Sequence, residues 1–213
     1  RLQTPGGSVA NTVAGAGALG LKTAFIGRVH DDELGRFYAK AMTDIGIDFV
    51  NDPVPGGETP TSRCMIFVTP DGERSLNTYL GISTGLTSDD VPQAVTEKAK
   101  LMFLEGYLFD HDAGKTAFRE AARAATAGGG MAGIAISDPF CVERHRADFL
   151  DLIEHDLGYV IGNEAEIRSL YQNDDLDADL EAVAAICPLV VCTRSGDGVT
   201  VMSPEGRLDV GVE

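Results

Sequence analysis

The segment Ala132-Gly-Ile-Ala-Ile-Ser137 is an apolar run of strand length that ends on a polar residue. Runs of the same kind recur along the chain, and patterns with helical spacing lie between them. The strand-like runs cover residues 101–104, 132–137, 159–162, 189–193 and 199–203, and the helical stretches cover residues 113–127, 143–155, 164–171 and 177–185. Because helices of this length connect parallel strands, the pattern predicts an α/β fold with a mostly parallel sheet and helices on both faces.

The first part of the chain follows the same alternation. Residues 9–19 are rich in small residues and end at Gly20, which predicts a closely packed helix. The pattern of residues 22–27 predicts a short buried strand. Residues 31–42 are predicted to form a helix, because acidic residues in their first turn suit the helix dipole. The expected core includes apolar residues of these strands and of the later ones, namely Phe25, Ile26, Ile134, Ile136, Val190 and Val191.

Residues 48–80 break this rhythm. Two strand-like runs, residues 64–68 and 75–79, are joined by Thr69-Pro-Asp-Gly72, which is a turn sequence. A hairpin inside an α/β chain is most simply a flap that lies off the main sheet. We therefore treat residues 1–213 as one α/β domain in which residues 48–80 contribute to a small β lid.

The chain is strongly acidic, with a net charge of −16 and a sequence pI near 4.5. Such a surface repels phosphate backbones and anionic lipids, so neither nucleic acid nor a membrane is an expected partner. No apolar stretch approaches the roughly 18 residues of a membrane span, and the start at Arg1 shows no secretory leader. We therefore expect a cytoplasmic protein.

Cysteine and histidine usage agrees with this location. The cysteines show no C-x-x-C spacing, and we expect reduced thiols in the core. The histidines are scattered without the paired spacing of zinc ligands, so no zinc site is expected. The cysteines are Cys64, Cys141, Cys187 and Cys192.

A glycine pair opens the first predicted helix, in Gly6-Gly7-Ser8-Val9-Ala10-Asn11. Glycines let a backbone approach a ligand closely, a helix start offers free N–H groups, and Asn11 offers a donor and an acceptor. The set suits a hydroxylated ligand such as a ribose. The same residues also fit a plain turn and helix cap, and their spacing is neither that of a Walker loop nor that of G-x-G-x-x-G.

Asn163 directly follows a predicted strand, and Glu166 falls at the third position of the next helix. This spacing fits a capping box, in which the two residues satisfy each other's backbone N–H groups. It also fits a site for hydrated Mg²⁺, because ligands bind outside the carboxyl ends of parallel strands and Mg²⁺ prefers oxygen ligands and water.

A turn of small residues, Thr193-Arg-Ser-Gly-Asp-Gly198, lies between two predicted strands. Backbone N–H groups in such a turn can bind a nucleotide phosphate or ribose. An ordinary hairpin turn has the same composition, so both interpretations stay open.

Two further polar residues are candidates. Arg74 lies on the predicted lid and is either a solvated charge or a clamp for a phosphate over a crevice. Asp138 follows a strand and is either the N-cap of the next helix or a ligand contact.

Four motifs occur in an order that resembles the PfkB (ribokinase-like) kinase family. They are Gly6-Gly7-Ser8-x-x-Asn11-Thr12, Gly27-x-x-x-Asp31-x-x-Leu34-Gly35, Asn163-x-x-Glu166 and Thr193-x-x-x-x-Gly198. The first two look like the family's N-terminal signature. Residues 69–81, 105–110 and 137–146 look most like bacterial adenosine-kinase-like members of that family.

This resemblance implies a Rossmann-like sheet with a small β lid, and MgATP-dependent phosphorylation of a primary alcohol on a nucleoside, adenosine preferred. It implies that Arg74 approaches the transferred phosphate and that Glu166 holds Mg²⁺ through water. The implied substrate-binding residues are Gly6, Gly7, Ser8, Asn11 and Asp138. The implied nucleotide-binding residues are Asn163, Thr193, Ser195, Gly196 and Gly198, although many family members have glycine where Ser195 stands.

The family's catalytic base is an Asp in a Gly-Ala-Gly-Asp loop. That loop does not occur in the sequence and is expected beyond Glu213, as the family's first strand is expected before Arg1. The chain by itself is therefore expected to be marginally stable and inactive. A sugar kinase for ribose, fructose or a related sugar, and a nucleoside- or nucleotide-binding fragment without catalysis, stay open as alternatives. A homodimer also stays open, because the lid of such kinases can be a dimer interface.

Overall fold

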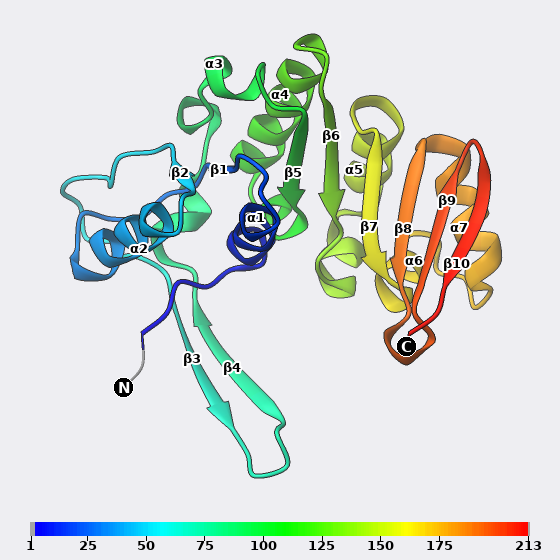
Figure 1. Ribbon diagram of the computed structural model, residues 1–213, viewed down its shortest axis with the longest axis horizontal. Coiled ribbons are helices and arrows are strands. Elements are labelled where there is room, and N and C mark those ends of the chain that lie inside the picture. Colours follow the sequence, from blue (N-terminus) through cyan, green and yellow to red (C-terminus); the bar gives the residue numbers. More distant parts are fainter. Residues whose placement is uncertain (1–2, 213) are drawn as a thin grey trace. The chain divides into compact units, whose positions relative to one another are not determined.

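Figure 1 shows a computed structural model of the chain, which describes residues 3–212. The chain divides into two compact units, Arg1–Asp90 and Val91–Glu213. The predicted lid segment, residues 48–80, falls inside the first unit. Its role as a lid on one α/β domain stays a prediction, and each unit is described by itself.

The second unit contains a six-stranded sheet with the order β10-β9-β8-β7-β6-β5. Strands β5 to β8 are parallel, and β9 and β10 are antiparallel to their neighbours, which confirms a mostly parallel sheet. The strands are β5 (Leu101–Glu105), β6 (Met131–Ala135), β7 (Tyr159–Asn163), β8 (Leu189–Thr193), β9 (Val199–Ser203) and β10 (Gly206–Val210). Strand β10 was not predicted, because all its residues are exposed and it has no apolar run.

The helices of this unit cover one face of the sheet (Figure 1). They are α3 (Gln93–Thr96), α4 (Asp112–Ala127), α5 (Pro139–Asp156), α6 (Glu164–Tyr171) and α7 (Leu176–Ile186). Consecutive strands add in one direction and right-handed crossovers return on one side, so α4 to α7 share that face. Helices on the opposite face, which the sequence predicted, are not contributed by this unit.

The core of the second unit lies between this sheet and these helices. Ile134, Val160 and Val190 are register partners, so their side chains share the helix-covered face, where all three are fully buried. Ile136 is buried with them, whereas Val191 points to the other face and is half-buried. The predicted core is therefore correct for Ile134, Ile136 and Val190, which are fully buried, and wrong for Val191.

The first unit is smaller and has a thinner core. Its elements are α1 (Ser8–Ala18), β1 (Ala24–Phe25), α2 (Glu33–Asp44), β2 (Asp48–Phe49), β3 (Arg63–Val68) and β4 (Arg74–Tyr79). Ala10, Met42 and Ile47 are buried, and Phe25 packs on Phe49 with ring centroids 5.7 Å apart. The predicted strand over residues 22–27 is reduced to two residues because only β2 pairs with it among the described residues, and Phe25 and Ile26 are half-buried rather than buried.

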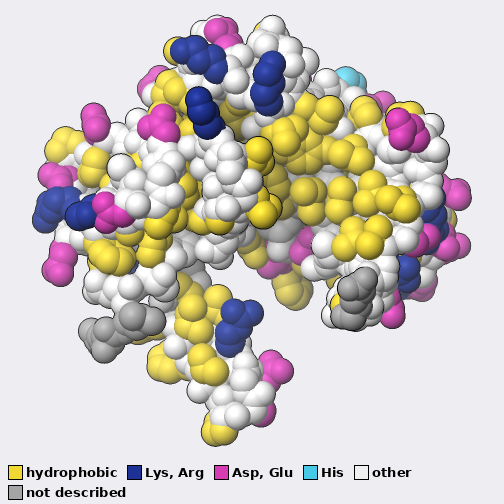
Figure 2. All heavy atoms as spheres, viewed as in Figure 1, with side chains coloured by type: hydrophobic (Ala, Val, Ile, Leu, Met, Phe, Trp, Pro, Cys, Tyr) yellow, Lys and Arg dark blue, Asp and Glu magenta, His cyan; other side chains and the backbone are white. Residues whose placement is uncertain are grey.

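Strands β3 and β4 form the predicted hairpin. They pair antiparallel from Arg63 with Tyr79 to Val68 with Arg74, as a separate two-stranded sheet. Gly72 has a φ of +88°, which the turn requires and glycine supplies without strain. All residues of both strands are exposed, and Figure 2 shows apolar side chains along this arm.

The hairpin explains one incorrect expectation about the cysteines. Cys141, Cys187 and Cys192 are free and buried as predicted, but Cys64 is exposed because both faces of β3 meet solvent. No helix within residues 3–212 has the length and apolar character that crossing a membrane requires.

Candidate functional site

The start of α1 brings together the predicted substrate-binding residues of the first unit. Gly7 precedes the helix with a φ of +110°, and no side chain caps the helix start within the described chain. Asn11 is exposed and lies one turn into the helix, where its backbone N–H donates to the Gly7 carbonyl at 2.9 Å. A Cβ at Gly6 would meet nothing within 4 Å. The helix start thus has room and backbone donors for a polar ligand.

The other candidates of the second unit gather at the carboxyl edge of its sheet. Asn163 and Thr193 are direct register partners at the ends of β7 and β8. Asp138 follows β6. Parallel strands therefore bring residues that are far apart in sequence to one edge, where ligands of open α/β sheets bind.

Asn163 and Glu166 form the predicted capping box. The Asn163 side chain accepts from the Glu166 backbone N–H at 2.9 Å, and Glu166 Oε2 accepts from the Asn163 backbone N–H at 3.0 Å. Burial raises the pKa of Glu166, the hydrogen bond from Asn163 opposes this, and the negative charge of Asp138 adds to the rise. The predicted capping box is therefore confirmed. The carboxylate of Glu166 also interacts electrostatically with Asp138, which lies outside α6.

The residues of this edge fit a hydrated magnesium ion. Glu166 and Asp138 offer carboxylate oxygens that repel each other, and a cation would relieve this repulsion. Within residues 3–212, no group of three or more His, Cys, Asp or Glu side chains is arranged to hold a metal by itself. Mg²⁺ normally keeps several waters and binds through one or two carboxylates plus phosphates, so this sparse donor set suits it.

Asp138 caps α5, as the sequence predicted. Its Oδ1 accepts from the Phe140 backbone N–H at 2.7 Å. The preceding Ser137 has a φ of +76°, and its hydroxyl accepts from Gly106 N–H at 3.1 Å. The Tyr107 hydroxyl donates to the Ser137 carbonyl at 3.3 Å. These bonds fasten the segment after β5 to the segment after β6.

Two aromatic residues at this edge were not predicted as functional. Tyr107 is 45 % exposed and Phe140 is 70 % exposed. Tyr107 lies two residues after the end of β5, whereas Phe140 lies at the start of α5, two residues after the candidate Asp138, and these positions were the available signal. Exposed rings beside a polar edge can stack on a planar ligand.

The turn after β8 connects two antiparallel strands, which confirms the hairpin interpretation. Ser195 and Gly198 have φ values of +49° and +93°, and Arg194 N–H donates to the Gly198 carbonyl at 2.7 Å. A Cβ at Gly198 would lie 1.9 Å from the Val210 carbonyl oxygen, so only glycine fits there. Ser195 and Gly196 are exposed, which leaves their backbone accessible to a ligand.

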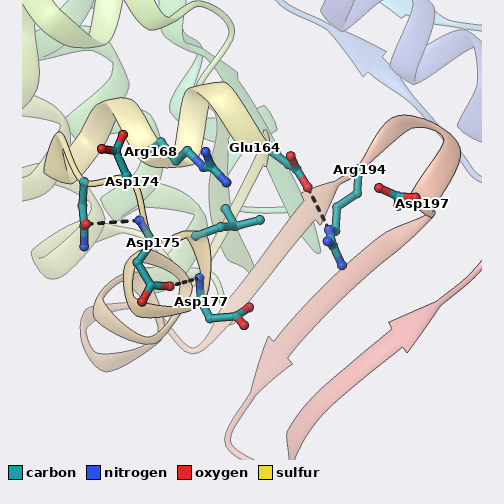
Figure 3. A pocket seen from close by; sticks show the side chains of 9 residues that line it. Glu164, Arg168, Asp174, Asp175, Asp177, Arg194 and Asp197 are labelled. Carbon is teal, nitrogen blue, oxygen red and sulfur yellow. Dashed lines mark hydrogen bonds and ion pairs between the residues drawn. The ribbon is translucent and has the colours of Figure 1, made fainter.

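A polar pocket of about 650 Å³ opens beside this turn (Figure 3). Its lining has five carboxylates against two arginines, and Arg194 is paired with Glu164 at 2.9 Å. None of the predicted nucleotide-binding residues lines it, and its acidity disfavours a phosphate. The lining residues are Glu164, Arg168, Asn173, Asp174, Asp175, Leu176, Asp177, Arg194 and Asp197.

Arg74 begins β4 on the hairpin of the first unit and is exposed. Its predicted contact with a transferred phosphate stays a prediction. The catalytic Asp loop, which is expected beyond Glu213, also stays a prediction.

A family model for the pfkB family of carbohydrate kinases matches residues 2–211. The chain belongs to this family. Its six-stranded sheet, with β5 to β8 parallel, is the pfkB-type arrangement that the resemblance implied.

Individual pfkB relatives differ in the substrate that their names give. The chain is 41 % identical to adenosine kinase from Sinorhizobium meliloti, with a TM-score of 0.94 over 100 % of this chain and 65 % of that one. It is 40 % identical to a probable sugar kinase from Rhizobium etli CFN 42, with a TM-score of 0.91 over 98 % and 63 %. A 5-dehydro-2-deoxygluconokinase from Halalkalibacterium halodurans is 31 % identical over 122 residues, which are 56 % of this chain and 37 % of that protein. The chain thus spans less than two thirds of these relatives.

Proposed function

We propose that the protein containing this chain transfers the γ-phosphoryl group of MgATP to a primary alcohol of a nucleoside, with adenosine preferred. The observation that carries this proposal is the 41 % identity with an adenosine kinase along the whole chain. Because the chain spans 65 % of that relative, the activity is proposed for the complete protein.

The exposed aromatics favour a nucleoside over a simple sugar. Tyr107 and Phe140 follow neighbouring parallel strands, and their segments are joined through Ser137. A purine offers a flat π-face that such rings can stack on, whereas a sugar offers hydroxyl groups. We assign these two residues to the base, and Gly6, Gly7, Ser8 and Asn11 to the ribose hydroxyls, with Asp138 as a further substrate contact.

ATP and Mg²⁺ are assigned to the polar residues after β7 and β8. Mg²⁺, when bound, would neutralise charge on the phosphates during transfer. Glu166 would hold it through water, while Asn163 and Thr193, paired at the sheet edge, would orient the phosphates. Backbone N–H groups of Ser195 and Gly196 would bind the rest of the nucleotide, Gly198 would keep the turn in shape through its own N–H bond to the Ser195 carbonyl, and Arg74 would contact the transferred phosphate.

The test is transfer of labelled phosphate from γ-³²P-ATP to adenosine, fructose or 5-dehydro-2-deoxygluconate by the complete protein. We expect adenosine to have the largest kcat/KM. Phe140→Ala should raise KM for adenosine up to about tenfold, the factor that corresponds to a lost aromatic contact of about 1.4 kcal/mol. Thr116→Ala, on the exposed surface of α4, is the matched control and should change neither constant.

Two other outcomes would replace this proposal. Faster transfer to a sugar, with no effect of Phe140→Ala, would make the protein a sugar kinase, which the 5-dehydro-2-deoxygluconokinase relative favours. Saturable binding of adenosine and ATP without any transfer would make it a binding protein.

We also propose a homodimer that pairs the hairpins of two copies. Hairpin β3–β4 exposes Met65, Ile66, Phe67, Val68 and Leu76 by 53 to 65 %, more apolar surface than one thin arm normally shows to water. Light scattering after gel filtration should give twice the chain mass, and Phe67→Lys should restore the monomer. A monomer at all concentrations would contradict this.

A further inference from the structure

The hairpin β3–β4 joins the rest of the first unit through a narrow root. Thr61 lies two residues before β3 and is 3 % exposed, although every residue of the two strands is exposed. Gly81 lies two residues after β4 with a φ of +52°, and a Cβ there would be 2.3 Å from the Pro60 carbonyl oxygen. Ile82 N–H donates to that oxygen at 3.1 Å. The two legs of the hairpin therefore touch at its root.

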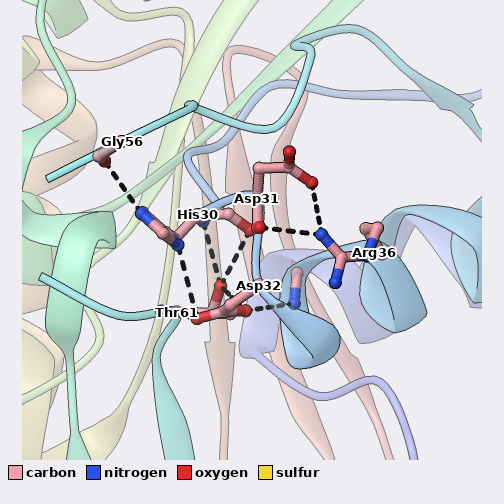
Figure 4. Close-up of polar contacts among 7 residues, drawn as sticks. His30, Asp31, Asp32, Arg36, Gly56 and Thr61 are labelled. Atoms are coloured by element: carbon pink, nitrogen blue, oxygen red, sulfur yellow. Dashed lines mark hydrogen bonds and ion pairs between the residues drawn. The ribbon is translucent and has the colours of Figure 1, made fainter. Parts of the chain in front are cut away.

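One carboxylate holds this root to the start of α2 (Figure 4). Asp32 Oδ2 accepts from the Thr61 backbone N–H at 2.9 Å, and Asp32 Oδ1 accepts from the Thr61 hydroxyl at 2.8 Å. Asp32 Oδ1 also accepts from Gly35 N–H at 2.8 Å, which caps α2. Asp32 therefore binds the helix start and the hairpin root at once, across 29 residues of sequence.

The surrounding residues are shaped for this contact. A Cβ at Gly35 would lie 2.8 Å from the Thr61 hydroxyl oxygen and 1.9 Å from the His30 carbonyl oxygen, so only glycine allows the approach. His30 N–H donates to the Thr61 hydroxyl at 2.9 Å, and its ring Nε2 lies 2.8 Å from the Gly56 carbonyl. The end of the motif over residues 27–35 thus encloses Thr61.

We propose that Asp32 is a positioning residue that anchors the root of hairpin β3–β4 and so fixes the direction in which the hairpin leaves the first unit. Beyond the root, the hairpin pairs with no other strand of the described chain. Within one copy of the chain, its direction is therefore set at the root, because its own strands carry no packing that could hold it. Arg74 begins β4 and moves with it, and its use on a phosphate rests on the proposed function.

The experiment follows the hairpin in the Phe67→Lys background, in which the proposed pairing of two hairpins cannot hold it in place. Cys64 on β3 is the exposed one of the free cysteines in the described chain, so a maleimide dye reports hairpin motion through nanosecond anisotropy decay. Asp32→Asn places an amide NH₂ against the Thr61 N–H. Thr61→Val removes the hydroxyl but leaves the carboxylate cap of α2 in place. Circular dichroism confirms that each variant is folded.

Matched controls distinguish loss of the contact between Asp32 and Thr61 from a general destabilisation of the first unit. Asp31→Asn removes the neighbouring carboxylate, which pairs with Arg36 at 2.7 Å on the exposed side of α2. Thr61→Ser keeps the hydroxyl. Both controls should give the anisotropy of the Phe67→Lys protein itself.

We expect Asp32→Asn and Thr61→Val to raise the population of rapidly turning hairpins about tenfold, the factor that corresponds to one lost hydrogen bond to a charged group. An unchanged decay in either variant, or an equal rise in Asp31→Asn, would overturn the assignment of Asp32 as the anchor. These measurements need no ligand, so they stand even if the protein proves not to be a nucleoside kinase. If it is one, the same two variants should raise KM for adenosine more than they lower kcat.

Discussion

Both carboxylate oxygens of Glu166 accept hydrogen bonds from Asn163, one from the backbone N–H at 3.0 Å and one from the side-chain amide at 2.7 Å. The residue assigned to the metal is therefore already engaged in holding the start of α6. The two roles of Glu166 can be tested separately, because a capping box needs only a hydrogen-bond acceptor whereas Mg²⁺ binding needs a negative charge.

Glu166→Gln separates these two roles. Gln keeps an acceptor for the Asn163 N–H, so the melting temperature should fall by only a few degrees, as for a partly retained cap. The Mg²⁺ concentration for half-maximal phosphate transfer should rise strongly, since the negative charge is lost. A large loss of stability with an unchanged Mg²⁺ dependence would leave capping as the only role of Glu166.

Asn11→Ala tests the substrate contact at α1. If Asn11 binds the ribose hydroxyls, its removal should weaken adenosine binding by about 1–3 kcal/mol, as expected for a lost polar partner, and leave ATP binding nearly unchanged. Isothermal titration with each ligand measures both effects. Thr12→Ala is the control, because the Thr12 hydroxyl donates within the helix to the Ser8 carbonyl at 2.9 Å. Equal weakening of both ligands would indicate a damaged helix instead.

Phe149 should dominate the stability of the second unit. It is fully buried and stacks on Phe109 with ring centroids 4.2 Å apart. Phe149→Ala should lower the free energy of unfolding by about 3–5 kcal/mol through lost burial and a cavity. Phe140→Ala removes the same side chain at a 70 % exposed position and should cost less than about 1 kcal/mol. Urea unfolding compares the two, and similar losses would contradict the burial described here.

Asp32 makes part of the stability dependent on pH. Partial burial of Asp32 raises the pKa of its carboxyl group. Hydrogen bonds from Thr61 and Gly35, together with the nearby His30, outweigh this and lower the pKa below its ordinary value of 3.8. The folded state therefore favours the ionised form, and this stabilisation is complete above about pH 4 and lost as the pH falls through the lowered pKa. Urea unfolding between pH 2 and 5 should show a shallower acid loss in Asp32→Asn, and an unchanged slope would count against the anchor.

Sequence patterns predicted the central strands because a buried strand appears in the local sequence as a continuous apolar run. Ile134, Val160 and Val190 lie in continuous apolar runs, as expected for parallel strands covered by helices. Strand β10 has no such run, since it is an exposed edge strand paired only with β9 among the described residues. Its existence depends on tertiary pairing, which no local pattern expresses.

The candidate site also has features that local sequence predicts and features that only the fold creates. The capping box of Asn163 and Glu166 spans three residues and is readable from spacing alone. The pairing of Asn163 with Thr193 follows only from strand register, and the contact of Asp32 with Thr61 joins an N-terminal motif to a loop with no motif of its own. Long-range contacts of this kind require the fold, which explains why the sequence analysis did not name Thr61.

The sheet order of the second unit has a consequence for synthesis. From β5 to β10, each strand pairs with the strand made immediately before it, so no strand waits for a distant partner. A ribosome delivers about 5–20 residues per second, whereas closing loops of this length takes far less than a second. Each strand that leaves the exit tunnel therefore meets an edge that is already in place, and this unit can assemble in the direction of translation.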